Sequence, residues 1–65
     1  MLYKVVLLHD EEGITARVPG LPGCWSEGDT EAEALANIKD AIRDYLAAVE
    51  QEYASADVRE VDIAV

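Results

Sequence analysis

One strong helix signal sits in the middle of the sequence and limits the folds that the rest of the chain can adopt. Thr30 and Glu33 match the capping box Ser/Thr-x-x-Glu, in which each side chain can accept a hydrogen bond from the other's free backbone amide. Apolar residues then recur at three- and four-residue spacing, as in a helix that buries one face: Leu35, Ile38, Ile42, Tyr45, Leu46 and Val49. We therefore expect one amphipathic helix that ends between Glu52 and Ala54.

The residues before this helix predict three short strands. Residues 2–9 are apolar on both alternating faces, which is typical of a strand that is covered on both sides. A turn at 10–13 follows, and residues 14–18 alternate between apolar and polar, as expected for an antiparallel partner strand. Two prolines and two glycines in residues 19–23 interrupt the ladder, and residues 24–27 form a third short strand.

A fourth strand is expected at the C-terminus, where Val61, Ile63 and Val65 alternate with polar or small residues. The order β-β-β-α-β predicts an α+β fold, with one mainly antiparallel sheet and a single helix packed on one of its faces. Residues 1–65 are expected to form a single domain. Because one helix covers only one face of the sheet, the other apolar face would meet water, and such faces usually mark an interface.

The size and composition also point to self-association. A chain of 65 residues buries only about 60% of the surface that it exposes when unfolded, so its own core supplies little stability. One cysteine excludes an internal disulfide, and one histidine with one cysteine cannot form an ordinary structural zinc site. We therefore expect no cofactor and no metal, and a homodimer or homotetramer.

The net charge of -9, from 14 acidic and 5 basic residues, limits the partners. It opposes binding to nucleic acid and to anionic membranes, and it favours a basic protein partner. Residues 27–52 hold eight acids against Lys39 and Arg43, a net charge of 2 − 8 = -6. No apolar run approaches the roughly 20 residues of a membrane span, and no signal-peptide cleavage site follows the start, so we expect a cytoplasmic protein.

Little in the sequence supports an enzyme. His9 and Cys24 lie in separate segments, and a nucleophile–base pair needs a third, orienting group. Acidic residues are plentiful, but Glu33, Asp40 and Asp44 lie opposite the apolar stripe of the helix, where they are solvated rather than gathered around metal ions. We therefore expect no catalytic residues.

Two apolar residues near the Pro-Gly loop allow two interpretations each. Leu21 and Trp25 are either folded onto the core or exposed as anchors of a protein interface, where aromatic residues concentrate binding energy. For Leu21 the core interpretation is slightly favoured, and for Trp25 the two are even. Together with nearby polar and acidic positions they make up the candidate partner-binding residues: Leu21, Pro22, Trp25, Glu27, Asp40 and Asp44.

The same loop carries a family resemblance. The motif comprises Val18-Pro19-Gly20-Leu21-Pro22-Gly23-Cys24, then Ser26-Glu27-Gly28-Asp29-Thr30, then Glu33-Ala34, Asn37, Ala41-Ile42 and Tyr45-Leu46. From Tyr3 to about Tyr53, the chain resembles the N-terminal domain of HicB-type antitoxins. The Leu-Pro-Gly-Cys and Ser-x-Gly-Asp-Thr pair, at this spacing before a helix, is specific to that family.

The resemblance implies a catalytically silent, partial ribonuclease-H-like domain that forms dimers or tetramers. It also implies a partner, a small basic HicA-type toxin that degrades messenger RNA and whose active site the antitoxin masks. A full HicB antitoxin continues into a DNA-binding domain, whereas this sequence stops at Val65, so operator binding is not carried over. The alternative is an orphan homo-oligomeric domain that acts as a regulatory or ligand-binding module without a toxin.

Overall fold

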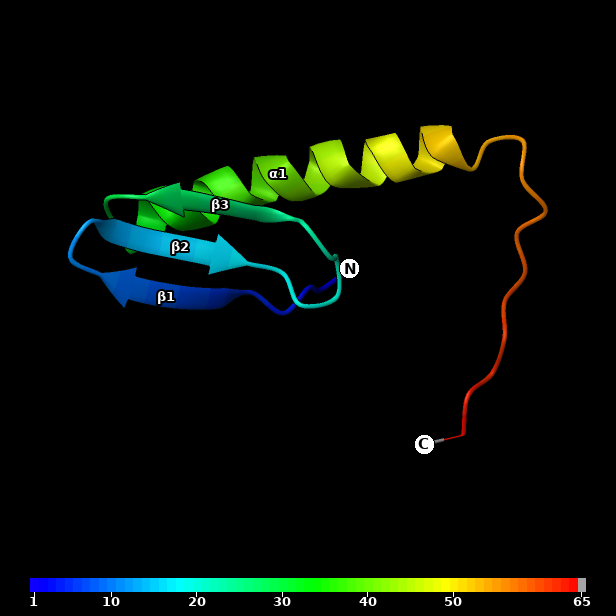
Figure 1. The fold of residues 1–65 in the computed structure, drawn as a ribbon, viewed down its shortest axis with the longest axis horizontal. Helices are drawn as coiled ribbons and strands as arrows, with labels where there is room; N and C mark the ends of the chain where they lie inside the picture. Colours follow the sequence, from blue (N-terminus) through cyan, green and yellow to red (C-terminus); the bar gives the residue numbers. More distant parts are fainter. Residues whose placement is uncertain (65) are drawn as a thin grey trace.

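The computed structural model describes residues 1–64 as three strands followed by one long helix. The elements are β1 (Val6–Asp10), β2 (Gly13–Arg17), β3 (Trp25–Gly28) and α1 (Glu31–Glu52). The strands form one antiparallel sheet in the order β1-β2-β3, and α1 covers one of its faces (Figure 1). The expected α+β class, with one open sheet and a single helix, is confirmed.

The hairpin between β1 and β2 is closed by a two-residue turn. The Asp10 carboxylate accepts hydrogen bonds from the backbone N–H groups of Glu12 (2.8 Å) and Gly13 (3.1 Å). Gly13 adopts a φ of +146°, a conformation that residues with a side chain rarely take. The turn pairs Asp10 with Gly13, and this pairing sets the register that brings Val6 opposite Arg17.

The helix begins where the capping box predicts. Thr30 is the N-cap, and its Oγ1 accepts a hydrogen bond from the backbone N–H of Glu33 at 3.1 Å. The return bond differs from the expected one, because the Glu33 carboxylate accepts from the N–H of Asp29 (3.4 Å) rather than from that of Thr30. The helix ends at Glu52, within the expected range.

The buried core is small and lies between α1 and the sheet. It consists of Ala16, Val18, Cys24, Ala34 and Ile38. The helix approaches β3 closely at Gly28, where an added Cβ would lie only 2.6 Å from the backbone nitrogen of Ala34. Ile38 is the one large side chain of the described residues that is fully buried, so it lies at the centre of the helix–sheet contact.

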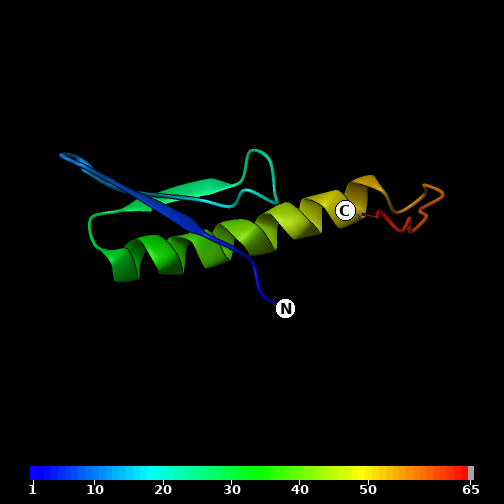
Figure 2. The same ribbon diagram turned by 90° about the horizontal axis from the view of Figure 1, so that it is seen from below.

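The two faces of the sheet differ: the pattern of the first strand, apolar on both faces, indicates cover on both, but α1 covers only one of them. Tyr3, Val5 and Leu7 point toward the helix and pack against the core. The opposite face is uncovered, as Figure 2 shows from below, and it exposes Leu8 (48%) and Trp25 (54%). The strand itself is shorter than expected, starting at Val6 rather than at residue 2, because β2 ends opposite Val6 and leaves the earlier residues without a partner.

The fourth strand expected at residues 61–65 does not form within this chain. Residues 57–64 belong to no strand, and Val61 and Ile63 are 78% and 77% exposed. A 22-residue helix is about 33 Å long and a five-residue strand about 17 Å, so the tail starts well beyond the sheet (Figure 1). Val65 lies outside the described residues.

Short-range hydrogen bonds shape the start of this tail. The backbone N–H of Ala54 donates to the carbonyl of Gln51, and that of Ala56 donates to the carbonyl of Tyr53. Further on, the Arg59 guanidinium donates to the Asp57 carboxylate at 2.7 and 3.1 Å, and this bond holds the pKa of Asp57 below its ordinary value. Over residues 1–64, no helix combines the length and the apolar character that a membrane span requires.

Candidate protein-binding surface

The Pro-Gly loop between β2 and β3 is built from two consecutive turns. The N–H of Leu21 donates to the carbonyl of Val18 (3.0 Å), and the N–H of Cys24 donates to the carbonyl of Leu21 (2.9 Å). In the second turn Pro22 is followed by Gly23 at φ +84°, the combination that defines a type II turn. The two turns hold the loop in one shape beside the sheet.

This loop and the ends of β1 and β3 form a groove of about 300 Å³. The lining residues are Val6, Arg17, Val18, Pro19, Leu21, Pro22, Gly23, Cys24 and Trp25. Leu21 is half-buried and packs against the core, so the favoured core interpretation of this residue is confirmed. Trp25 instead lies on the uncovered face and is 54% exposed, which decides between its two interpretations against burial in the core.

The register explains why Trp25 stands where it does. Trp25 pairs with Arg17, and Arg17 pairs with Val6, so the three side chains form one row across the uncovered face. The structure thus adds Val6 and Arg17 to the surroundings of Trp25. The two-residue turn at 11–12 indicates the pairing of Val6 with Arg17, because a turn of that length fixes which residues of the hairpin lie opposite each other, whereas the pairing of Arg17 with Trp25 depends on the Pro-Gly loop.

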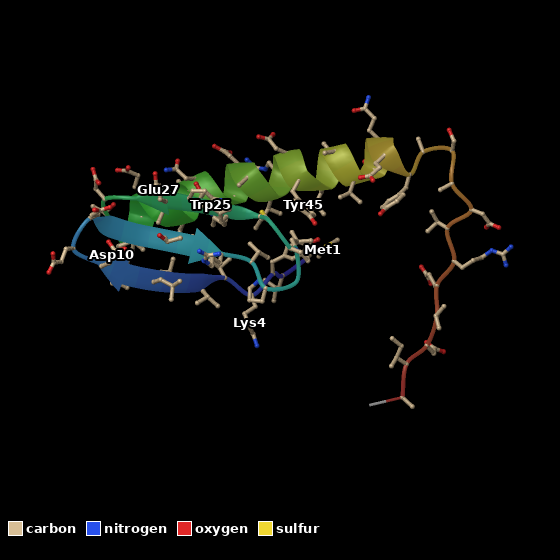
Figure 3. All side chains as sticks on the ribbon, in the orientation of Figure 1. Met1, Lys4, Asp10, Trp25, Glu27 and Tyr45 are labelled. Carbon is tan, nitrogen blue, oxygen red and sulfur yellow. The ribbon has the colours of Figure 1, made fainter. Side chains whose placement is uncertain are left out.

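An acidic depression of about 560 Å³ lies at the other end of β3. Its lining residues are Asp10, Glu12, Gly13, Ile14, Thr15, Glu27, Gly28, Asp29, Glu33 and Asn37, among them five acids and no Lys or Arg. Figure 3 shows Glu27 and Trp25 on the same strand, so the depression and the groove adjoin along β3.

The helix extends this acidic character along the outer edge of β3. The Asn37 side-chain amide donates to the Glu27 carbonyl at 2.8 Å, which places this flank of α1 beside that strand. Asp44 is two helical turns from Asn37 and therefore lies on the same flank. Asp40 is also exposed, but it pairs with Arg43 at 3.2 Å, so part of its charge is already neutralised.

The candidate residues thus divide into two neighbouring groups. Leu21, Pro22 and Trp25 share the groove, whereas Glu27 lines the depression. Asp40 and Asp44 line neither cavity and belong to the exposed surface of α1.

The opposite flank of the helix is different in charge. Lys39 and Arg43 border an apolar groove beside the start of β1, away from the acids that flank β3. These two cations were not among the candidate residues predicted from the sequence. The four-residue spacing of Lys39 and Arg43 indicates this basic flank, because it puts both cations on one side of the helix next to the apolar stripe.

His9 and Cys24, the two side chains considered as a possible nucleophile–base pair, lie at opposite ends of the sheet. His9 sits at the end of β1, where its Nε2 is 3.5 Å from a Glu31 carboxylate oxygen, and both side chains are largely exposed. Cys24 is buried at the opposite end of the sheet, next to the Pro-Gly loop. Within residues 1–64, no three His, Cys, Asp or Glu side chains come together as metal ligands would. The surface is therefore suited to binding through shape, apolar contact and charge.

Comparison with known proteins places the chain in a family. Residues 3–64 match the family model of the HicB-like antitoxins of bacterial toxin–antitoxin systems. The chain belongs to the HicB-like antitoxin family. The match includes the Pro-Gly loop, Trp25, the whole of α1 and most of the exposed tail.

Individual relatives share a substantial part of the sequence. A UPF0150 protein of Thermoplasma acidophilum is 51% identical over 47 residues, which are 71% of this chain and 68% of that protein. A UPF0150 protein of Helicobacter pylori is 50% identical over 50 residues, 77% of this chain and 69% of its own length. An uncharacterized 14.9 kDa protein of Haemophilus phage HP1 is 45% identical over 42 residues, only 32% of its length. No solved structure matches the chain.

Proposed function

We propose that this protein is a non-enzymatic antitoxin that binds and masks a small basic HicA-type toxin in the cytoplasm. The observation that carries the proposal is the half-exposed Trp25 on an uncovered sheet face, beside a pre-shaped loop groove and an acidic depression. Family membership supplies the antitoxin role, and the charge supplies the kind of partner.

The loop groove and the acidic depression would contribute to toxin binding in different ways. Tryptophan at the centre of an interface contributes large apolar contact, and truncation of such an anchor costs at least about 2 kcal/mol of binding. The acids of the depression and of the β3 flank would attract a basic toxin over a distance and orient it, which raises the association rate more than the final affinity. Binding should therefore weaken as salt rises.

The oligomeric state is part of the same proposal. We infer that the protein acts as a homodimer or homotetramer of single domains spanning residues 1–65. Large exposed apolar residues, among them Met1, Leu2, Val61 and Ile63, favour self-association whether or not a toxin is present. The same observation supports the second candidate, an orphan homo-oligomeric HicB-like module without a toxin.

The test is calorimetric titration with a small basic HicA-type toxin. We expect a complex that Trp25→Ala weakens at least about 30-fold, the equivalent of about 2 kcal/mol. Tyr53→Ala is the matched control, because Tyr53 is an equally exposed aromatic (52%) at the far end of the helix, and it should leave binding unchanged. Equal effects of the two variants would contradict the assignment of the site.

A charge-reversal pair tests the acidic flank separately. Asp44→Lys should slow association at low salt, whereas Glu50→Lys should not, because Glu50 lies two helical turns from Arg43 on the opposite flank. Absence of any binding at low salt would reject the toxin partner and favour the orphan module.

A further inference from the structure

The chain exposes more surface than a folded monomer of its size should. A compact protein of 7.1 kDa is expected to expose about 4,100 Å², whereas this chain exposes 5638 Å². Its radius of gyration is 14.4 Å, against about 10.7 Å for a compact 65-residue domain. The excess, on the order of 1,500 Å², exceeds the roughly 800 Å² that each partner of a stable complex buries.

Part of this surface is an apolar groove on the helix-covered side of the sheet. The groove measures about 320 Å³ and is lined by Met1, Leu2, Tyr3, Val5, Leu35, Ile38, Lys39, Ile42 and Arg43. It is open because α1 packs mainly over β3 and, to a smaller extent, over β2. β1 is an edge strand, so the backbone groups along its free edge can accept a further strand.

The tail has the sequence that such a strand requires. Val61 and Ile63 alternate with Glu60 and Asp62, so in an extended conformation the apolar and acidic side chains point to opposite sides. The tail is extended, and every residue from 53 to 64 is exposed. If it is added to β1, the two apolar residues can enter the groove while the two acids remain in water.

The charge beside the free edge of β1 suits the acidic side of the tail. In an extended tail Glu60 and Asp62 lie on the side opposite Val61 and Ile63, which is the side away from the groove and from α1. Lys4 projects from the start of the chain away from α1 (Figure 3), so it lies on the side where the two acids would stand. Residues 58–64 carry these two acids against Arg59, a net charge of 1 − 2 = -1.

The course of the tail favours a groove on another molecule. The tail leaves α1 beyond the end of the sheet and runs outside it, through a turn that backbone hydrogen bonds hold (Figure 1). We propose that residues 58–64 of one copy add as a strand to the β1 edge of a second copy and place Val61 and Ile63 in its groove. In a reciprocal exchange the tail of each copy covers the groove of the other. The inference rests on the proposed function, because it describes how the proposed homodimer would form.

Cross-linking distinguishes the possible occupants of the groove. In a Cys24→Ala background, Val5→Cys and Ile63→Cys are combined in one chain and treated with a short bis-maleimide. We expect a linked dimer on a denaturing gel. An internally linked monomer, identified by its mass, would show that the chain's own tail occupies its groove. The absence of any link would show that the tail does not occupy the groove. Either result would overturn the proposed exchange. Val6→Cys in place of Val5→Cys is the matched control, because Val6 faces the other side of the sheet, and should link several-fold more slowly.

Sedimentation velocity tests the same exchange without a reagent. The chain truncated after Asp57 should sediment as a monomer with the helical circular dichroism of the full chain, because the exposed tail contributes nothing to its core. Lys4→Glu should weaken the dimer several-fold, whereas Arg17→Glu, the same charge change on the central strand β2, should not. Dimers that persist in the truncated chain would overturn the proposal. These measurements contain no toxin, so a monomeric variant that still binds toxin would refute the exchange alone.

Discussion

Replacement of Ile38 by alanine tests whether one contact holds the helix on the sheet. Ile38 is 1% exposed, so nearly all of its side chain is removed from water. Losing three buried carbons costs about 2.4 kcal/mol in transfer free energy at about 0.8 kcal/mol each. The cavity left behind raises the loss to about 3–4 kcal/mol. A 65-residue domain has only about 3–10 kcal/mol of total stability, so Ile38→Ala should remove about a third or more of it and should unfold the chain at the lower end of this range.

The assay is urea unfolding followed by circular dichroism at the helix band, at one fixed protein concentration because self-association changes apparent stability. Ile38→Val should cost about 0.5–1.5 kcal/mol, as the same position loses one carbon. Leu8→Ala, on the uncovered face and 48% exposed, should cost less than about 1 kcal/mol. If Ile38→Ala were no worse than Leu8→Ala, the packing of α1 on the sheet would differ from that described above.

Two further substitutions test how the helix is placed and started. Gly28→Ala should destabilise by about 1–3 kcal/mol, because its Cβ would lie 2.6 Å from the Ala34 backbone nitrogen, whereas Gly20→Ala, with nothing within 4 Å, should be neutral in the same unfolding assay. Equal midpoints for the two variants would refute the close approach of β3 and α1. Thr30→Ala should cost about 1 kcal/mol by removing the acceptor for the Glu33 N–H, and Thr30→Ser should restore it; an unchanged stability would place the helix start elsewhere.

Local signals predicted the helix and the hairpin well. The capping box at Thr30 and the spacing of the apolar stripe depend on neighbours three and four residues away, and such signals can be recognised without knowledge of the fold. The paired faces of the first strand were also predictable, because alternation alone separates Leu7 from Leu8. The class of fold followed from these elements and their order.

Features that depend on the arrangement of elements were harder to predict. The alternation of Val61 and Ile63 indicates a strand but does not say which edge it joins, and within this chain it joins none. The exposure of Trp25 depends on which face α1 covers. The hydrogen bond from the exposed Asn37 side chain to the Glu27 carbonyl likewise depends on α1 lying along the β3 edge. The candidate residues Asp40 and Asp44 were correctly expected on the helix surface, but their separation from the groove required the structure.

The most direct test of the antitoxin role is messenger RNA cleavage by a small basic HicA-type toxin, titrated with this protein at low salt. Cleavage should fall with each addition and stop near equal molar amounts. Trp25→Ala should need a large excess for the same inhibition, whereas Tyr53→Ala should behave like the unmodified chain. Cleavage that continues unchanged in an excess of the folded protein would contradict the role proposed for the surface around Trp25.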